Sequence, residues 1–147
     1  MSNLSIVAGL VITATIGLVF YLMENKTPAW LVALGNGIAQ AEGFGIPGAI
    51  PTTHNNPGDI TDGNGNKLQF PDVSAGFQAL YNNVLGSLNG TSGYYYPSMT
   101  LAGFADAWTG GDSTEDWLNT VLSVFNSQTG ASLTADNTLQ DVANVHS

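Results

Sequence analysis

The sequence predicts an α+β protein: a mostly helical domain with one small β-hairpin, preceded by a single transmembrane helix. Three observations indicate this class. An uncharged apolar run covers residues 4–23, and apolar residues recur at helical spacing in several later segments. The turn-forming sequence Asp62-Gly63-Asn64-Gly65 separates two short stretches that can pair. With 147 residues, the chain can form one domain with a hydrophobic core and a short additional segment.

The apolar run from Leu4 to Met23 has the length of a membrane-spanning helix. About 20 residues cross a hydrocarbon core of about 30 Å, and this run carries no charge. A cleaved signal peptide is disfavoured because no basic residue precedes the run and no small-x-small cleavage site follows it. A buried core helix is the other alternative. We therefore expect residues 1–26 to form an anchor and its joint, with residues 4–23 in a lipid bilayer, and residues 27–147 to form the second domain.

The first helix of this domain is expected to run from Pro28 to Glu42. Thr27 and Pro28 are residues that begin helices, and Gly43 is a natural stop. Its apolar residues share one face: Trp30, Leu31, Leu34, Ile38 and Ala41. Residues 43–58 contain three prolines and are expected to form a loop.

Residues 60–70 are expected to form the hairpin, with its turn at residues 62–65. Three helices and a short last one should follow. They begin at Ser74, at Thr100, at Ser113 and at or after Thr134. The helix that begins at Thr100 runs through Trp108, and the helix that begins at Ser113 ends at Gly130. The latter has its acidic residues in the first turn, where the helix dipole favours anions.

Composition excludes several classes of function. The formal net charge is −9, and Lys26 and Lys67 are the only lysine or arginine residues. The chain therefore has almost nothing to neutralise the phosphates of a nucleic acid. The absence of cysteine excludes disulfides and thiolate metal sites. His54 and His146 are far apart in the sequence and no carboxylate cluster has ligand spacing, so we expect no metal site and no cofactor.

The order of three motifs is the most specific signal. They are Ile38-Ala39-Gln40-Ala41-Glu42-Gly43-Phe44, then Asn55-Asn56-Pro57-Gly58-Asp59-Ile60, then Phe70-Pro71-Asp72-Val73-Ser74-Ala75-Gly76-Phe77-Gln78-Ala79-Leu80. This order resembles the lysozyme-like peptidoglycan-cleaving domains of phage structural proteins and lytic transglycosylases, over residues 30–130. Two features depart from the family pattern. Asp59 stands where asparagine is common, and the chain is unusually acidic for a protein that binds cell wall.

Glu42 is the expected catalytic residue, since by this resemblance it matches the family's catalytic acid. The local sequence agrees. A carboxylate at a helix C-terminus lies at the negative end of the dipole, and partial burial behind Ile38 and Phe44 disfavours its charge. Both effects raise its pKa, as a general acid working near neutral pH requires. The alternative is a solvated glutamate at a frayed helix end.

The other site residues are less specific. Asp59 and Asp62 are candidates for the second acid that hydrolysis with two carboxylates requires, with turn capping as the alternative for Asp59. The resemblance also implies that a lytic transglycosylase needs only one acid, because the sugar's own 6-hydroxyl attacks. Substrate binding is expected from His54, Asn55, Asn56 and Tyr96, although the loop residues have solvated or loop-stabilising roles as alternatives. Trp108 and Trp117 are interpreted as core residues.

The sequence thus predicts a muramidase, in the first place a lytic transglycosylase, whose substrate is the peptidoglycan glycan strand. Its expected location is membrane-anchored in a phage virion, at an internal membrane or a vertex, where it opens the cell wall during infection beside other virion proteins. The bacterial cell envelope is the alternative location. A non-catalytic structural subunit of a virion or envelope assembly, with a membrane-anchored binding domain, is the alternative function.

Overall fold

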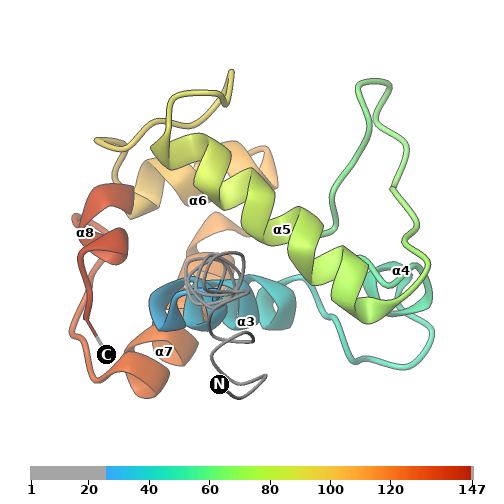
Figure 1. Cartoon of the computed structure of the whole chain (residues 1–147), viewed down its shortest axis with the longest axis horizontal. Helices are drawn as coiled ribbons and strands as arrows, with labels where there is room; N and C mark the ends of the chain where they lie inside the picture. Colours follow the sequence, from blue (N-terminus) through green and yellow to red (C-terminus); the bar gives the residue numbers. More distant parts are fainter. Residues whose placement is uncertain (1–25, 147) are drawn as a thin grey trace, which may run out of the picture.

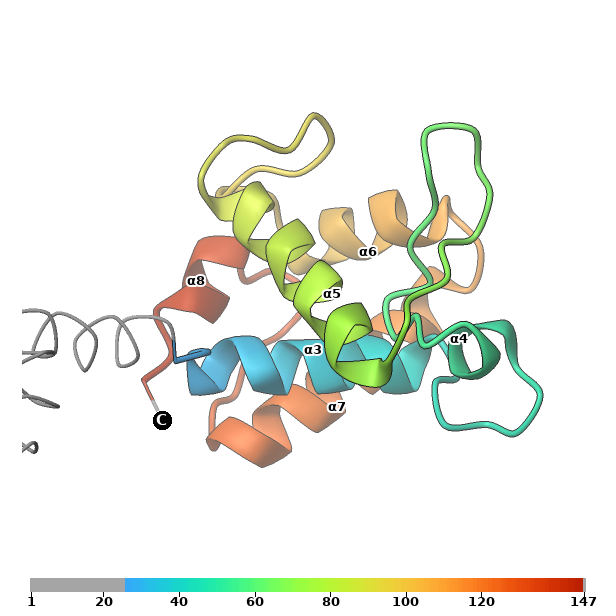
Figure 2. The same cartoon turned by 45° about the vertical axis from the view of Figure 1, so that its right-hand side comes forward.

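The computed structural model describes residues 26–146, and their regular structure is helical (Figure 1). Six helices, labelled as in Figure 1, follow one another along this range: α3 (Ala29–Ala41), α4 (Ile50–Thr53), α5 (Val73–Leu88), α6 (Leu101–Thr109), α7 (Thr114–Thr129) and α8 (Leu139–Ala143). Figure 2 shows α5 and α6 on one side of α3, with α7 on the other.

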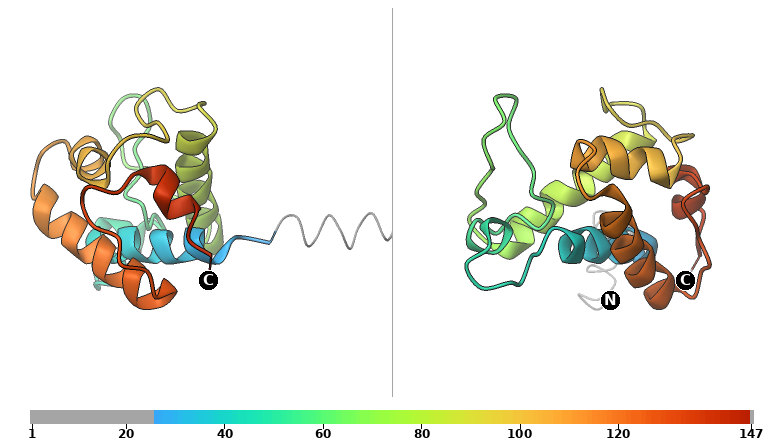
Figure 3. Two further views of the ribbon diagram at one scale, coloured as in Figure 1. Left: turned by 90° about the vertical axis from the view of Figure 1, so that its left-hand side faces the viewer. Right: turned by 180° about the vertical axis from the view of Figure 1, so that it is seen from behind.

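Helices α3 and α7 form the centre of the core. Figure 3 shows α7 from behind, running across α3, and these two helices share the most extensive contact. Gly37 permits their close approach, because a Cβ at this position would lie 2.9 Å from the carbonyl oxygen of Val121. The core residues of both helices are buried: Leu31, Leu34, Ile38, Trp117, Val121 and Phe125. Their burial removes apolar surface from water, which is the main force that stabilises the fold.

Most helix boundaries agree with the sequence. Helix α3 ends with Glu42 as its C-cap, and Gly43 follows in the left-handed conformation at φ +79°. Thr100 caps α6 through its side chain, which accepts a hydrogen bond from the backbone N–H of Gly103. Helix α5 begins earlier than expected, since Asp72 rather than Ser74 is its N-cap. The short helix α4 was not expected within the loop of residues 43–58.

The predicted β-hairpin over residues 60–70, and with it the α+β class, is wrong. No strand is present among residues 26–146, and the two arms of this segment meet at one isolated bridge between Thr61 and Lys67. The buried side chain of Asn56 adds further hydrogen bonds to both arms. Its amide nitrogen donates to the carbonyl oxygens of Ile60 and Leu68, both at 2.9 Å, and its oxygen accepts from the N–H of Ile60 at 2.9 Å. Two backbone hydrogen bonds also join the arms, from the Asp62 N–H to the Asn66 carbonyl and from the Leu68 N–H to the Ile60 carbonyl, but no strand ladder forms.

The predicted transmembrane helix over residues 4–23 lies outside the described residues. Between residues 26 and 146, no helix has the length and apolar character to cross a bilayer. The longest helices in this range, α5 and α7, have 16 residues each. At 1.5 Å per residue they extend about 24 Å, against a hydrocarbon core of about 30 Å. The prediction of a membrane-anchored protein, in a virion or a cell envelope, is therefore corrected for residues 26–146, where no helix could span a bilayer.

Candidate active site

Glu42 lines a cavity of about 370 Å³ where four segments meet. These are the end of α3, the loop of residues 58–68, the end of α6 and the beginning of α7. Polar and charged side chains make up much of its wall: Glu42, Asp59, Thr61, Lys67, Asp112 and Ser113. A larger cavity of about 660 Å³ lies at the beginning of α3, but Lys26 is its only titratable lining residue. The titratable side chains are therefore concentrated in the smaller cavity, the one lined by Glu42.

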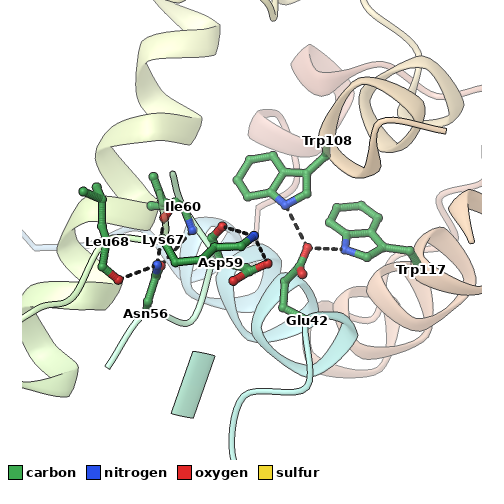
Figure 4. A network of polar contacts seen from close by, with 8 residues as sticks. All are labelled: Glu42, Asn56, Asp59, Ile60, Lys67, Leu68, Trp108 and Trp117. Atoms are coloured by element: carbon green, nitrogen blue, oxygen red, sulfur yellow. Dashed lines mark hydrogen bonds and ion pairs between the residues drawn. The ribbon is translucent and has the colours of Figure 1, made fainter. Parts of the chain in front are cut away.

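Two tryptophans hold the Glu42 carboxyl group (Figure 4). The indole Nε1 of Trp117 donates to Oε1 of Glu42 at 2.7 Å, and the indole Nε1 of Trp108 donates to the same oxygen at 2.9 Å. Trp108 lies in the last turn of α6, and Trp117 lies in the first turn of α7. Buried indole N–H groups require an acceptor, and here one glutamate oxygen serves both. The side chain of Glu42 is therefore fixed at the cavity wall.

The pKa of Glu42 is raised above its ordinary value, and burial is the largest cause. Removal of the carboxylate from water disfavours its charged form. The negative charge of Asp59 raises the pKa further, whereas the two indole hydrogen bonds and the charge of Lys67 lower it. Since burial outweighs the opposing effects, the protonated acid persists to higher pH than in a solvated glutamate.

A second cavity, of about 470 Å³, adjoins the first. Both are lined by Asp59, Thr61 and Trp108, so these residues lie at the boundary between them. The second cavity is also lined by Asn83, Tyr94 and Tyr95. Pockets that bind small molecules usually have volumes of 300–1,000 Å³ and combine apolar walls with a few placed polar groups. The two cavities together have this character.

A row of aromatic rings connects the two cavities. The ring centroids of Trp117 and Trp108 are 6.0 Å apart, and those of Trp108 and Tyr95 are 5.8 Å apart with an interplanar angle of 27°. Phe104 packs beneath this row, 5.3 Å from Trp108 and 5.1 Å from Tyr95. Burial raises the pKa of Tyr95, and the neighbouring Tyr94 raises it further. The Tyr95 hydroxyl therefore remains protonated at neutral pH, as a hydrogen-bond donor.

The loop of residues 58–68 brings Asp59 and Lys67 to the cavities. Lys67 forms an ion pair with Oδ2 of Asp59 and donates a second hydrogen bond to the Asp59 carbonyl oxygen at 3.2 Å (Figure 4). Asp59 has φ +49°, a conformation that costs a residue with a side chain about 1 kcal/mol or more. At the base of the loop, the buried Asn56 fixes the backbone at Ile60 and Leu68. The position of Asp59 is thus determined by contacts on both sides.

Of the residues that the sequence singled out, Glu42 and Asp59 meet in one cavity. Asp62 lines only the second, and its carboxylate holds its own turn. Hydrogen bonds from the side chain and backbone of Asn66, and from the backbone of Asn64, lower the pKa of Asp62. The other four residues, His54, Asn55, Asn56 and Tyr96, line neither of the two cavities.

The structure gives these four residues other surroundings. Asn56 is fully buried and bonded to the backbone, and Asn55, at φ +51°, donates to the carbonyl oxygen of Phe70 at 3.1 Å. His54 has a buried Nδ1 with no hydrogen-bond partner. Tyr96 is 53% exposed, beside the two tyrosines that line the second cavity.

Sequence reasoning did not identify Trp108, Trp117, Lys67 and Tyr95 as site residues. Trp117 is 6% exposed, so its interpretation as a core residue is confirmed, but the same residue also binds Glu42. Two signals were available. A buried tryptophan predicts an acceptor for its N–H, and Lys67 is one of only two fixed cations in an acidic chain.

The structure also holds no group of three potential metal-ligating side chains among the described residues.

Comparisons of this chain with protein-family models, with curated proteins and with solved structures gave no match. The resemblance to lysozyme-like domains therefore stays a prediction.

Proposed function

We propose that this protein cleaves the glycosidic bonds of peptidoglycan, with Glu42 as the general acid, and that it does so as a lytic transglycosylase. The observation that supports this most is the Glu42 carboxyl group itself. It lines a cavity of suitable size, its burial raises its pKa, and two indoles fix its direction. A general acid needs a proton to give near the working pH and a fixed direction in which to give it.

The two hydrogen bonds suggest which oxygen carries the proton. Both indoles donate to Oε1, and no hydrogen bond from the described residues reaches Oε2. An oxygen that accepts two N–H groups is a poor site for a proton, because its lone pairs are already used. In the proposed reaction Oε2 therefore carries the proton and gives it to the oxygen of the scissile bond.

One acid is sufficient for the proposed chemistry. The bond between the anomeric carbon and the bridging oxygen breaks, and the proton of Glu42 goes to that oxygen. The 6-hydroxyl oxygen of the same sugar then bonds to the anomeric carbon, and its proton returns to the Glu42 carboxylate. No water is consumed, and the product is an anhydro sugar. Asp59 is engaged by Lys67, which favours this route over hydrolysis with a free second carboxylate.

The adjoining cavities provide a surface for a glycan strand. Trp108 and Tyr95 present aromatic rings along it, and Asn83, Thr61 and Asp59 add polar groups. With a net charge of −9, long-range attraction of an anionic polymer is absent. Binding therefore depends on short-range hydrogen bonds and on contacts with aromatic rings.

The test is clearance of purified peptidoglycan by the full chain, followed as turbidity, with Glu42→Gln beside it. Loss of a general acid lowers the rate by about 10²–10⁴-fold. Glu115→Gln is the matched control, because Glu115 is exposed in the first turn of α7 and lines neither cavity. Equal clearance by wild type and Glu42→Gln, or no clearance by wild type, contradicts the proposal and favours a protein that only binds.

Mass analysis of the released fragments distinguishes the two reactions. Anhydro ends, one water lighter than reducing ends, are expected. If a Glu42-dependent reaction instead releases reducing ends, Glu42 is still the general acid, but the reaction is hydrolysis and not intramolecular attack.

A further inference from the structure

Lys67 is a rare fixed cation that lies at the candidate active site. Only two residues of the sequence are lysine or arginine, and Lys67 lines the cavity of Glu42. Its ammonium group binds both the carboxylate and the carbonyl oxygen of Asp59. The other cation, Lys26, lines a separate cavity at the beginning of α3. One of two fixed cations is thus used on a single carboxylate at the candidate active site.

Asp59 depends on this contact. Its side chain is 22% exposed, and its second oxygen, Oδ1, is buried without a hydrogen-bond partner. A carboxylate that is largely removed from water is costly unless it is paired. If Lys67 is removed, the carboxylate loses the cation that fixes its position. The negative charge of Asp59 is then no longer held against the cavity.

We propose that Lys67 is a positioning residue for the cleavage reaction, holding the ionised carboxylate of Asp59 against the cavity in which Glu42 gives up its proton. This inference rests on the proposed function. As the glycosidic bond breaks, positive charge develops on the sugar ring. A carboxylate already fixed at the cavity wall stabilises that charge without reorganisation during the reaction.

The charges around Glu42 give this proposal a distinctive signature. Asp59 and Lys67 face the cavity from the loop of residues 58–68, and Asp112 faces it from the connection between α6 and α7. Burial is the main cause of the raised pKa of Glu42, but Asp59 raises it further and Lys67 lowers it. Removal of either member of the ion pair should therefore move the titration of Glu42, in opposite directions.

The experiment measures kcat of the full chain on purified peptidoglycan for Lys67→Met, with Lys67→Arg as the conservative variant. We expect Lys67→Met to lose roughly tenfold or more, since it releases the carboxylate that stabilises the developing positive charge. Lys67→Arg should recover most of the loss because it keeps the cation. Lys26→Met removes the same charge away from the site, and its kcat should stay within about twofold of wild type. Circular dichroism melts check that each variant is folded.

The pH profile separates positioning from a merely structural role. The alkaline limb of kcat, where Glu42 loses its proton, should move to higher pH in Lys67→Met and to lower pH in Asp59→Asn. A structural role would lower activity and leave the limb in place.

Each outcome decides between the two proposals. Wild-type kcat and an unmoved limb in Lys67→Met overturn this inference, as does an equal loss in Lys26→Met. Activity that requires Glu42 but is indifferent to Lys67 contradicts this inference alone. An inactive wild type, or full activity in Glu42→Gln, removes the proposed function and this inference together.

Discussion

The body around α3 and α7 and the segment of residues 54–70 are stabilised in different ways. In the body, side chains such as Leu34, Ile38 and Phe125 are buried against one another. In the segment, the fully buried Asn56 joins two arms of backbone through three hydrogen bonds. The body is thus stabilised by many apolar contacts, and the segment by hydrogen bonds, three of which come from one buried side chain.

The candidate active site lies where these two regions meet. Glu42 lies at the C-terminal end of α3 in the body, and Asp59 and Lys67 lie in the segment. Gly76 makes part of the junction, because a Cβ there would lie 1.8 Å from the carbonyl oxygen of Asn55. The helical body thus supplies the proton donor, and the hydrogen-bonded segment supplies the ion pair that lines the same cavity.

The largest effect is expected in the body. Phe125→Ala should lower the free energy of unfolding by about 3–5 kcal/mol, because Phe125 is 1% exposed and its loss leaves a cavity. Urea unfolding measures this. Asn119→Ala, exposed on the same helix, should change stability by less than about 0.5 kcal/mol. A cost for Phe125→Ala below about 1 kcal/mol would mean that apolar packing does not dominate there.

Asn56→Ala should have the next largest effect. It leaves the Leu68 carbonyl and the Ile60 N–H without their Asn56 partner, whereas the Ile60 carbonyl still accepts from the N–H of Leu68. Each group that stays unsatisfied costs about 1–3 kcal/mol. Partial relaxation reduces the sum, so we expect a loss of about 2–3 kcal/mol in urea unfolding. Asn64→Ala at the exposed tip of the same loop is the control. Equal effects of the two substitutions would show that the segment does not depend on Asn56.

Glu42→Gln should have the smallest effect on stability, and of opposite sign. The folded-state pKa of Glu42 is raised by burial, so its ionisation opposes folding. The contribution of protonated Glu42 to folding stability is fully present below about pH 4.3, the pKa of the unfolded state. It is lost as the pH rises through the higher pKa of the folded state. Glutamine stays neutral and still offers an oxygen to both indoles.

Melting temperatures of wild type and Glu42→Gln across pH test this sign. The two should agree at pH values well below 4.3, and the variant should melt higher at neutral pH. A variant that melts lower at neutral pH would indicate that the charged form of Glu42 is the stable one.

The same comparison explains how much the sequence could predict. The end of α3 at Glu42 was predictable because helical spacing and Gly43 are local signals. The hairpin was mispredicted because turn residues do not reveal that the Asn56 side chain binds both arms. Ladder pairing and side-chain bridging leave similar sequence patterns, and only the three-dimensional position of Asn56 distinguishes them.

The candidate site was predictable only in part, for a related reason. Glu42 was found through its place at a helix end and through motif order. Trp108 and Trp117 lie 66 and 75 residues further along the chain, and no local pattern links them to Glu42. The ion pair of Lys67 with Asp59 likewise depends on the fold of the loop. The contacts that shift the pKa of Glu42 therefore could not be predicted from the spacing of residues in the sequence.

The most direct test of the central claim is a titration of the Glu42 side-chain carboxyl carbon by NMR in the full chain. The resonance can be assigned by its absence in Glu42→Gln, since the chain has few glutamates. We expect a midpoint above the ordinary value of about 4.3, because burial outweighs the two indole hydrogen bonds and Lys67. A midpoint at or below that value would show a carboxylate ionised at neutral pH and would contradict the role of Glu42 as a proton donor.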